Sequence, residues 1–240
     1  MVQHDSQVAL REEDILIVSY PRSGNTWGRF LLANLLAPDR DIDFHTIHKI
    51  IPDLEKNPKG IDSLPRPRVI KSHSSYCPQY SNVIYIVRDG RDVSVSYYEF
   101  LRGRQRFEGS FLDFLRDKQR GPFAWNEHVV SWLDNSSNLN FLLVKYEDLH
   151  RNAVLCLKQM AEFVGLETGE ENIIQAVNKC SFKRMKRIEQ ERGRLYKKGE
   201  EDLFMRKGAV GSWKEYFEGE HLRLFSDLAG ETLLRLGYVF

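Results

Sequence analysis

Residues 14–27 read D-I-L-I-V-S-Y-P-R-S-G-N-T-W, a short apolar run followed by a turn of mostly polar residues. The apolar part, residues 14–19, has the length and β-branched content of a strand covered on both faces. Residues 25–37 carry apolar residues at helical spacing and stop before Pro38, so they predict a helix. Strand, tight turn and helix in this order are typical of a phosphate-binding loop.

The turn contains the groups that hold an anion. Gly24 lets the backbone approach a ligand, while Ser23, Asn25 and Thr26 offer hydroxyl and amide groups. The start of the helix adds free N–H groups and a partial positive charge. The second glycine and the lysine of the Walker A pattern are absent. An anion fits this loop, although a turn before an N-capped helix without any ligand gives the same pattern.

The alternation of strand and helix recurs along the chain. Further strand patterns lie at residues 68–71, 82–87 and 140–145. Helical patterns lie at residues 91–101, 111–115, 125–133 and 152–164, and the chain beyond about residue 170 is mostly helical in pattern. Alternating strands and helices predict crossover units and a parallel sheet. Ligands of such sheets bind beyond the carboxyl ends of the strands, so we expect the chemistry just after Ser19, Lys71, Val87 and Lys145.

Composition excludes several classes of protein. Hydrophobic residues make up 42% of the 240 residues, enough for one globular domain over residues 1–240. A net charge of +1 gives no overall field for binding nucleic acid or an anionic membrane. No apolar stretch reaches the ~18 to 20 residues of a transmembrane segment, and the acidic start is unlike a signal peptide, so we expect a cytoplasmic protein. The three cysteines are far apart and suggest neither disulfides nor a metal site.

Four segments together resemble a known family. They are residues 20–27, the triplet Lys71-Ser72-His73, residues 83–98 (V-I-Y-I-V-R-D-G-R-D-V-S-V-S-Y-Y) and residues 204–214 (F-M-R-K-G-A-V-G-S-W-K). In this order, over about residues 14–217, they resemble the cytosolic-type sulfotransferases. The resemblance implies a P-loop-like three-layer α/β fold with a central parallel sheet flanked by helices.

The resemblance also implies a reaction. A sulfuryl group would move from 3'-phosphoadenosine 5'-phosphosulfate (PAPS) to the hydroxyl or amine of a small-molecule, glycan or lipid acceptor. The transfer would be in line and would leave 3'-phosphoadenosine 5'-phosphate (PAP). Neither a metal nor a covalent enzyme intermediate is required.

The resemblance assigns roles around the donor's 5' end. It implies that the 5'-phosphosulfate is held by the loop residues Arg22, Ser23, Gly24, Asn25 and Thr26. The commonest family pattern has lysine in place of Arg22. Arginine stays protonated, so Arg22 supplies charge and paired hydrogen bonds but is a poor proton donor to the leaving group. Lys71 is expected to reach the sulfuryl oxygens, and His73 to take the acceptor's proton as general base.

Other residues are assigned to the rest of the donor. The resemblance implies that the 3'-phosphate is bound by Arg88 and Ser96 and covered by Arg206, Lys207 and Gly208. It implies that adenine lies between Trp27 and Phe182 and is lined by Tyr146, Cys180 and Met185. Alternatives stay open, because Arg88 could pair with Asp89 or Asp92, the Ser96 hydroxyl could bond to its own helix, and Cys180 and Met185 could be core residues.

Two other functions fit part of the pattern. A P-loop kinase-like phosphotransferase would need magnesium and a Walker lysine. A catalytically silent nucleotide-binding protein would not need His73 and Lys71. The acceptor is also open: an apolar alcohol or phenol is favoured by Phe44, Phe100, Phe107, Phe111, Phe114 and Phe123, which could equally be core residues. An anionic or sugar acceptor is favoured by Arg102, Arg104 and Arg106. The usual dimer motif of the family is not evident after Lys214, which leaves the oligomeric state open.

Overall fold

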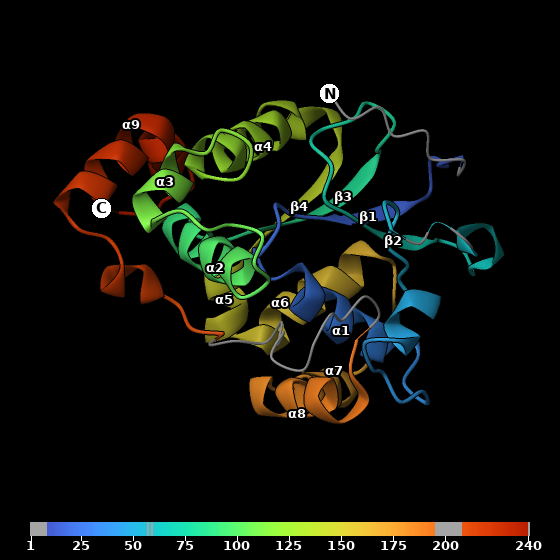
Figure 1. The fold of residues 1–240 in the computed structure, drawn as a ribbon. Helices are drawn as coiled ribbons and strands as arrows, with labels where there is room; N and C mark the ends of the chain where they lie inside the picture. The colour runs from blue at the N-terminus through green and yellow to red at the C-terminus, as the bar shows by residue number, and fades with distance from the viewer. Residues whose placement is uncertain (1–8, 57, 59, 195–207, 240) are drawn as a thin grey trace.

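A single parallel sheet forms the centre of the computed structural model, which describes residues 9–56, 58, 60–194 and 208–239 (Figure 1). Its strands are β1 (Ile15–Val18), β2 (Val69–Ser72), β3 (Asn82–Val87) and β4 (Asn140–Lys145). They lie side by side in the order β2-β1-β3-β4. All neighbouring pairs are parallel, so the carboxyl ends of the strands meet at one edge of the sheet.

Helices cover both faces of this sheet (Figure 1). One layer contains α1 (Asn25–Leu36), α6 (Ala153–Phe163), α7 (Glu170–Lys179) and α8 (Phe182–Arg192). The other contains α2 (Gly90–Arg102), α3 (Phe111–Arg116), α4 (Pro122–Asn135) and α9 (Gly219–Arg235). Short elements complete the fold: α5 (Tyr146–Arg151), η1 (Thr46–Lys49), η2 (Ile61–Ser63), η3 (Ser136–Asn138) and η4 (Ser212–Glu215). The predicted three-layer α/β fold is confirmed.

The continuous apolar run of β1 is explained by its position between two cores. Ile17 packs into the cluster under α1 and α6, while Leu16 and Val18 pack into the cluster under α4 and α9. A strand with helices on both faces buries every side chain, so it shows no polar alternation. At Gly28 an added Cβ would lie 2.4 Å from the Ile86 side chain, which shows how closely α1 approaches the sheet.

Most predicted elements are found with small shifts of their ends. The strands at 82–87 and 140–145 have the predicted bounds, whereas the strand predicted at 68–71 lies at Val69–Ser72. Helix α4 begins earlier than predicted, at Pro122, because proline is favoured in the first turn of a helix. The short helix α5 was not predicted; Asn152 ends it and caps α6 by accepting from Leu155 N at 3.1 Å.

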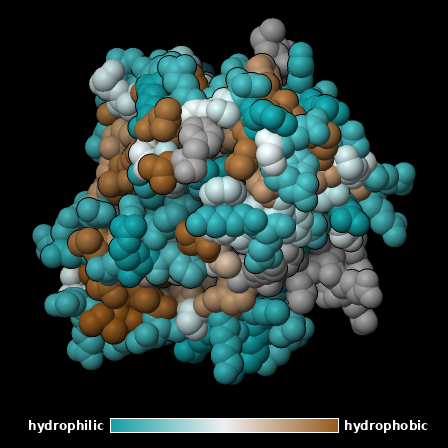
Figure 2. All heavy atoms as spheres, turned by 90° about the vertical axis from the view of Figure 1, so that its left-hand side faces the viewer, coloured by the Kyte–Doolittle hydropathy of each residue, from teal (hydrophilic) through white to brown (hydrophobic). Residues whose placement is uncertain are grey.

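The outer face of the second layer is mostly hydrophilic. Figure 2 shows the side of the molecule where α3 and α9 lie, with hydrophobic residues in small, separate patches. Within the described ranges, no helix combines the length and the apolar character that a membrane span requires.

A buried ion pair ties β2 to β1 at the start of both strands. Arg68 Nε donates to Asp14 Oδ1 at 2.7 Å, and Arg68 Nη2 donates to Asp14 Oδ2. Both side chains have an exposed fraction of 0%. The neighbouring pair between Arg66 and Glu13 is exposed by 65% and 43%. The Arg68–Asp14 pair is therefore shielded from water, whereas the Arg66–Glu13 pair is not.

We predict that Asp14→Ala lowers the free energy of unfolding by about 3 to 5 kcal/mol, because the buried Arg68 guanidinium loses its buried carboxylate and is left with Asp62, whose side chain is 68% exposed, as carboxylate partner. Glu13→Ala, the matched control next to it, should cost less than about 1 kcal/mol. Urea denaturation of both variants measures the difference. Equal effects of the two substitutions would show that the buried pair does not hold β2 in place.

Candidate active site

The carboxyl ends of the strands open into a cavity of about 470 Å³. Residues at or beyond the carboxyl ends of β1, β2, β3 and β4 line it together: Arg22, Gly24, Asn25, Thr26, Trp27, Lys71, His73, Arg88, Ser96 and Tyr146. Phe182, Met185 and Gly208 reach it from the C-terminal third of the chain. Sheet topology thus brings together most of the side chains that the sequence assigned to one site.

The loop between β1 and α1 has the form of an anion cradle. Gly24 has a φ of 99°, and a Cβ there would lie 2.5 Å from the Tyr146 ring, so only glycine fits. The first turn of α1 contains no acidic residue, which leaves the positive end of the helix dipole uncompensated locally. In the described part of the chain, the buried Ser23 Oγ and Asn25 Oδ1 have no hydrogen-bond partner. The loop therefore presents a positive helix end to the cavity.

Two arginines meet at this loop: Arg22 belongs to the loop, and Arg88 directly follows β3. Arg22 Nε donates to Ser96 Oγ at 3.1 Å. Arg88 donates through Nη1 to the Arg22 carbonyl at 3.4 Å, and its guanidinium lies 4.5 Å from the centre of the Tyr146 ring. Arg88 also lies 3.6 Å from Asp92, so the ion pair considered from the sequence is present as well. The result is a positive region at the end of β3.

The chain returns to the cavity at residues 208–213. Tyr146 Oη and His150 Nε2 both donate to the Gly208 carbonyl, at 3.1 and 2.6 Å, and Arg88 Nη2 donates to the Ala209 carbonyl at 2.8 Å. The Asp92 carboxylate then accepts from the backbone of the next residues, including Trp213 N at 2.9 Å. Gly208 thus lines the cavity, and its place over the 3'-phosphate stays a prediction, whereas Arg206 and Lys207 lie outside the described residues.

The residues assigned to adenine divide into two groups. Trp27, Tyr146, Phe182 and Met185 line the cavity, with the Trp27 and Tyr146 rings edge to face at 5.8 Å between centroids. Cys180 does not line it. Its thiol is buried beside Asn34 Nδ2 at 3.3 Å, and burial raises the pKa of this thiol to about 12. The Cys180 carbonyl accepts from Trp27 Nε1 at 3.0 Å. Cys180 therefore holds the Trp27 ring in position without lining the cavity itself.

Ser23 also differs from the expectation. Its side chain is buried beneath the loop and does not line the cavity, because the chain turns there between Tyr20 and α1. Ser23 N donates to the Tyr20 carbonyl at 3.3 Å within that turn. The part of Ser23 that shapes the loop is therefore its backbone.

His73 is held in the tautomer that a general base needs. Its Nδ1 lies 2.6 Å from the Ser19 carbonyl oxygen, which can only accept, so Nδ1 carries the proton and Nε2 has a free lone pair. Burial, together with the nearby charge of Lys71, keeps the pKa of His73 well below its usual value. His73 is therefore neutral at neutral pH and able to accept a proton in the cavity.

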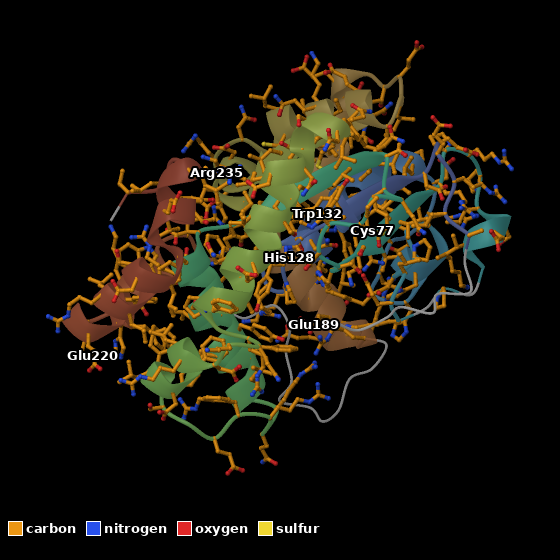
Figure 3. The ribbon with its side chains drawn as sticks, turned by 90° about the horizontal axis from the view of Figure 1, so that it is seen from above. Cys77, His128, Trp132, Glu189, Glu220 and Arg235 are labelled. Atoms are coloured by element: carbon orange, nitrogen blue, oxygen red, sulfur yellow. The ribbon has the colours of Figure 1, made fainter. Side chains whose placement is uncertain are left out.

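Two residues that the sequence did not single out fix the backbone of His73. Glu55 Oε1 accepts from His73 N and from Ser72 Oγ, each at 2.6 Å. On the other side, His128 Nε2 donates to the His73 carbonyl at 3.1 Å, and Tyr85 Oη donates to His128 Nδ1 at 2.9 Å. Figure 3 shows His128 and Trp132 on the side of α4 that faces the strands. Hydrogen bonds thus fix both the backbone N–H and the backbone C=O of His73.

Lys71 is engaged by carboxylates. Its Nζ donates to Asp53 Oδ2 at 2.9 Å and to Glu55 Oε2 at 3.1 Å. Burial lowers the pKa of Lys71, while the pKa of Glu55 is lowered to about 2 by Lys71 and by hydrogen bonds, against its own burial. Glu55 therefore stays ionised and keeps its hydrogen bonds down to acidic pH. The contact of Lys71 with sulfuryl oxygens stays a prediction.

Comparison with known proteins identifies the family of the chain. Residues 12–237 match the family model of the sulfotransferase domain. Human sulfotransferase 4A1 is 32% identical over 233 residues, which cover 87% of this chain and 76% of that protein. Rabbit amine sulfotransferase is 26% identical over 250 residues, covering 93% and 82%. The crystal structure of mouse sulfotransferase SULT7A1 complexed with PAP superposes with a TM-score of 0.71 at 25% identity and covers 95% of this chain and 87% of that one. The chain belongs to the sulfotransferase family, and it is an enzyme that transfers a sulfuryl group from PAPS.

Proposed function

We propose that His73 is the general base of this reaction and that Arg22 and Arg88 hold the two phosphate ends of the donor. The observation that carries the proposal is the hydrogen bond from His73 Nδ1 to the Ser19 carbonyl at 2.6 Å. It leaves Nε2 free in a cavity whose lining also includes both arginines. A neutral imidazole beside fixed cations suits proton transfer from an acceptor hydroxyl or amine.

The residues present fit the donor. The N-terminus of α1, which begins at Asn25 and has no acidic residue in its first turn, suits the 5'-phosphosulfate, and Thr26 adds a hydroxyl on the cavity wall. Arg88 and Ser96 suit the 3'-phosphate, which carries two charges. Trp27, Tyr146, Phe182 and Met185 supply the flat and apolar surfaces for adenine. Further contacts from Arg206 and Lys207 stay a prediction from the sequence.

The protein's part in the chemistry follows from these positions. As the acceptor oxygen or nitrogen bonds to sulfur, the bond from sulfur to the bridging phosphate oxygen breaks, and PAP leaves with that electron pair. His73 Nε2 takes the acceptor's proton. Arg22 lies where negative charge grows on the leaving phosphate, and a cation there stabilises the transition state more than the ground state. Because arginine keeps its proton, Arg22 acts through charge and hydrogen bonds.

The acceptor is proposed to be a small molecule with a hydroxyl or an amine. The relative from rabbit is named as an amine sulfotransferase, which supports including amines. A cytoplasmic location and a single domain over residues 1–240 stay predictions from the sequence. The kinase-like and catalytically silent alternatives find no support in the family match, and the clamped tautomer of His73 favours an active enzyme.

The proposal predicts that the purified protein, given PAPS and simple phenols or amines, forms products heavier by one SO₃ group in mass spectrometry. His73→Ala should lower kcat roughly 100- to 10,000-fold, because it removes the group that takes the acceptor's proton, while PAP still binds. His45→Ala is the matched control, because His45 is exposed and bonds to the Arg192 carbonyl away from this cavity. A His73→Ala variant as fast as the wild type would refute the assignment of the base.

Glu55 is predicted to act as a positioning residue through His73. Glu55→Ala removes the acceptor for His73 N and Ser72 Oγ, so we expect kcat to fall by roughly 100-fold while KM for PAPS changes little. Glu55→Gln retains an oxygen acceptor and should recover most of the lost rate. Steady-state kinetics of the two variants tests this. Equal losses in both, or a loss in KM alone, would contradict the positioning role.

A further inference from the structure

His150 lines the cavity but is not among the residues that the sequence assigned to the site. It lies four residues after Tyr146 in α5, so the two side chains share one face of this short helix. Both donate to one oxygen, the Gly208 carbonyl, His150 through Nε2 and Tyr146 through Oη. A carbonyl oxygen only accepts, so Nε2 of His150 carries the proton. One short helix thus binds a segment that begins 58 residues after His150 in the chain.

Three rings form the wall behind this contact. The ring centroids of Trp27, Tyr146 and His150 are 5.8 Å apart in each of the three pairs. Trp27 is fixed at its other end, where Nε1 donates to the Cys180 carbonyl. The Trp27 and His150 rings meet edge to face, which is a favourable arrangement of aromatic rings. The imidazole is therefore held by ring contacts as well as by its hydrogen bond.

Gly208 is enclosed from another side as well. An added Cβ there would lie 2.4 Å from the Phe182 ring, and the φ of Gly208 is 62°, in the left-handed region that favours glycine. Phe182 belongs to α8, whereas Tyr146 and His150 belong to α5. Gly208 therefore lies between α5 and α8, with its carbonyl turned toward α5.

The orientation of this carbonyl decides where the next N–H points. The bond between Gly208 and Ala209 is a trans peptide, in which C=O and N–H point in opposite directions, so Ala209 N–H points away from α5. Ala209 lines the cavity, and among the described residues no group accepts from its N–H. Arg88 Nη2 donates to the Ala209 carbonyl at 2.8 Å, so Ala209 lies beside the arginine proposed for the 3'-phosphate. A backbone donor is therefore available next to Arg88.

We propose that His150 is a positioning residue for the donor: by binding the Gly208 carbonyl, it aims Ala209 N–H at the 3'-phosphate. Hydrogen bonds to an ionised phosphate are stronger than those between neutral groups, so one well-aimed N–H adds to donor affinity. His150 acts through the backbone, because its Nε2 proton is used by the Gly208 carbonyl. The inference rests on the proposed function, because it concerns the 3'-phosphate that Arg88 is proposed to hold.

Two nucleotides that differ only in the 3'-phosphate test this role. They are PAP and adenosine 5'-monophosphate (AMP), each titrated calorimetrically into the full chain. His150→Phe keeps a ring beside Trp27 and Tyr146 but cannot donate to Gly208. We expect the ratio of PAP affinity to AMP affinity to fall roughly 3- to 10-fold in this variant, the effect of about one hydrogen bond, while AMP affinity changes little.

Two further variants separate the hydrogen bond from other effects. His150→Gln retains a side-chain N–H that can reach the Gly208 carbonyl, so it should recover most of the lost ratio. Arg151→Ala is the matched control: Arg151 is the next residue in α5, pairs with Asp148 at 2.9 Å and does not line the cavity. Both affinities should stay as in the wild type in this control. AMP binding also reports that each variant retains a folded site.

Three results would overturn the inference. The first is a wild-type ratio in His150→Phe. The second is an equal loss of PAP and AMP affinity, which would assign His150 to the adenine wall through Trp27. The third is a His150→Gln variant as impaired as His150→Phe. Failure of the proposed function is separately visible in the wild type, which would then bind PAP no more tightly than AMP or form no sulfated product.

Discussion

One hydrogen bond joins the residues that follow β1 and β2: His73 Nδ1 donates to the Ser19 carbonyl at 2.6 Å. It follows from the register of the sheet, in which Val18 pairs with Ser72, so that Ser19 and His73 are the next residues beyond the ends of β1 and β2. Ser19 opens the phosphate-binding loop, and His73 is the proposed base. A shift of one residue in this register would turn the imidazole away from the loop.

The other features of the site depend on this hydrogen bond between His73 and Ser19. Because the imidazole is desolvated and close to Lys71, it stays neutral in a cavity rich in cations. Glu55 partly balances that charge and also holds the backbone of His73, so one carboxylate serves both electrostatics and geometry.

The sequence predicted the sheet and most of the site because both depend on local patterns. The strands at 82–87 and 140–145 are apolar runs ended by polar residues, and the sheet brings the residues after them to one edge. Glu55 and His128 were missed because their roles arise from contacts with His73 across 18 and 55 residues of chain. For Cys180 the sequence left open whether the side chain lines adenine or belongs to the core, because an apolar residue beside a site has the same pattern as one in the core; the structure places it in the core.

The central claim is that His73 is neutral, with its proton on Nδ1 and a free Nε2. Nuclear magnetic resonance of ¹⁵N-labelled histidine, with the His73 signals assigned from His73→Gln, measures this directly. We predict an Nδ1–H tautomer at neutral pH that stays unprotonated at Nε2 until the pH falls well below about 6.5, the usual histidine pKa, because the charged form is disfavoured in the folded protein. An Nε2–H tautomer, or an imidazolium at neutral pH, would contradict the account.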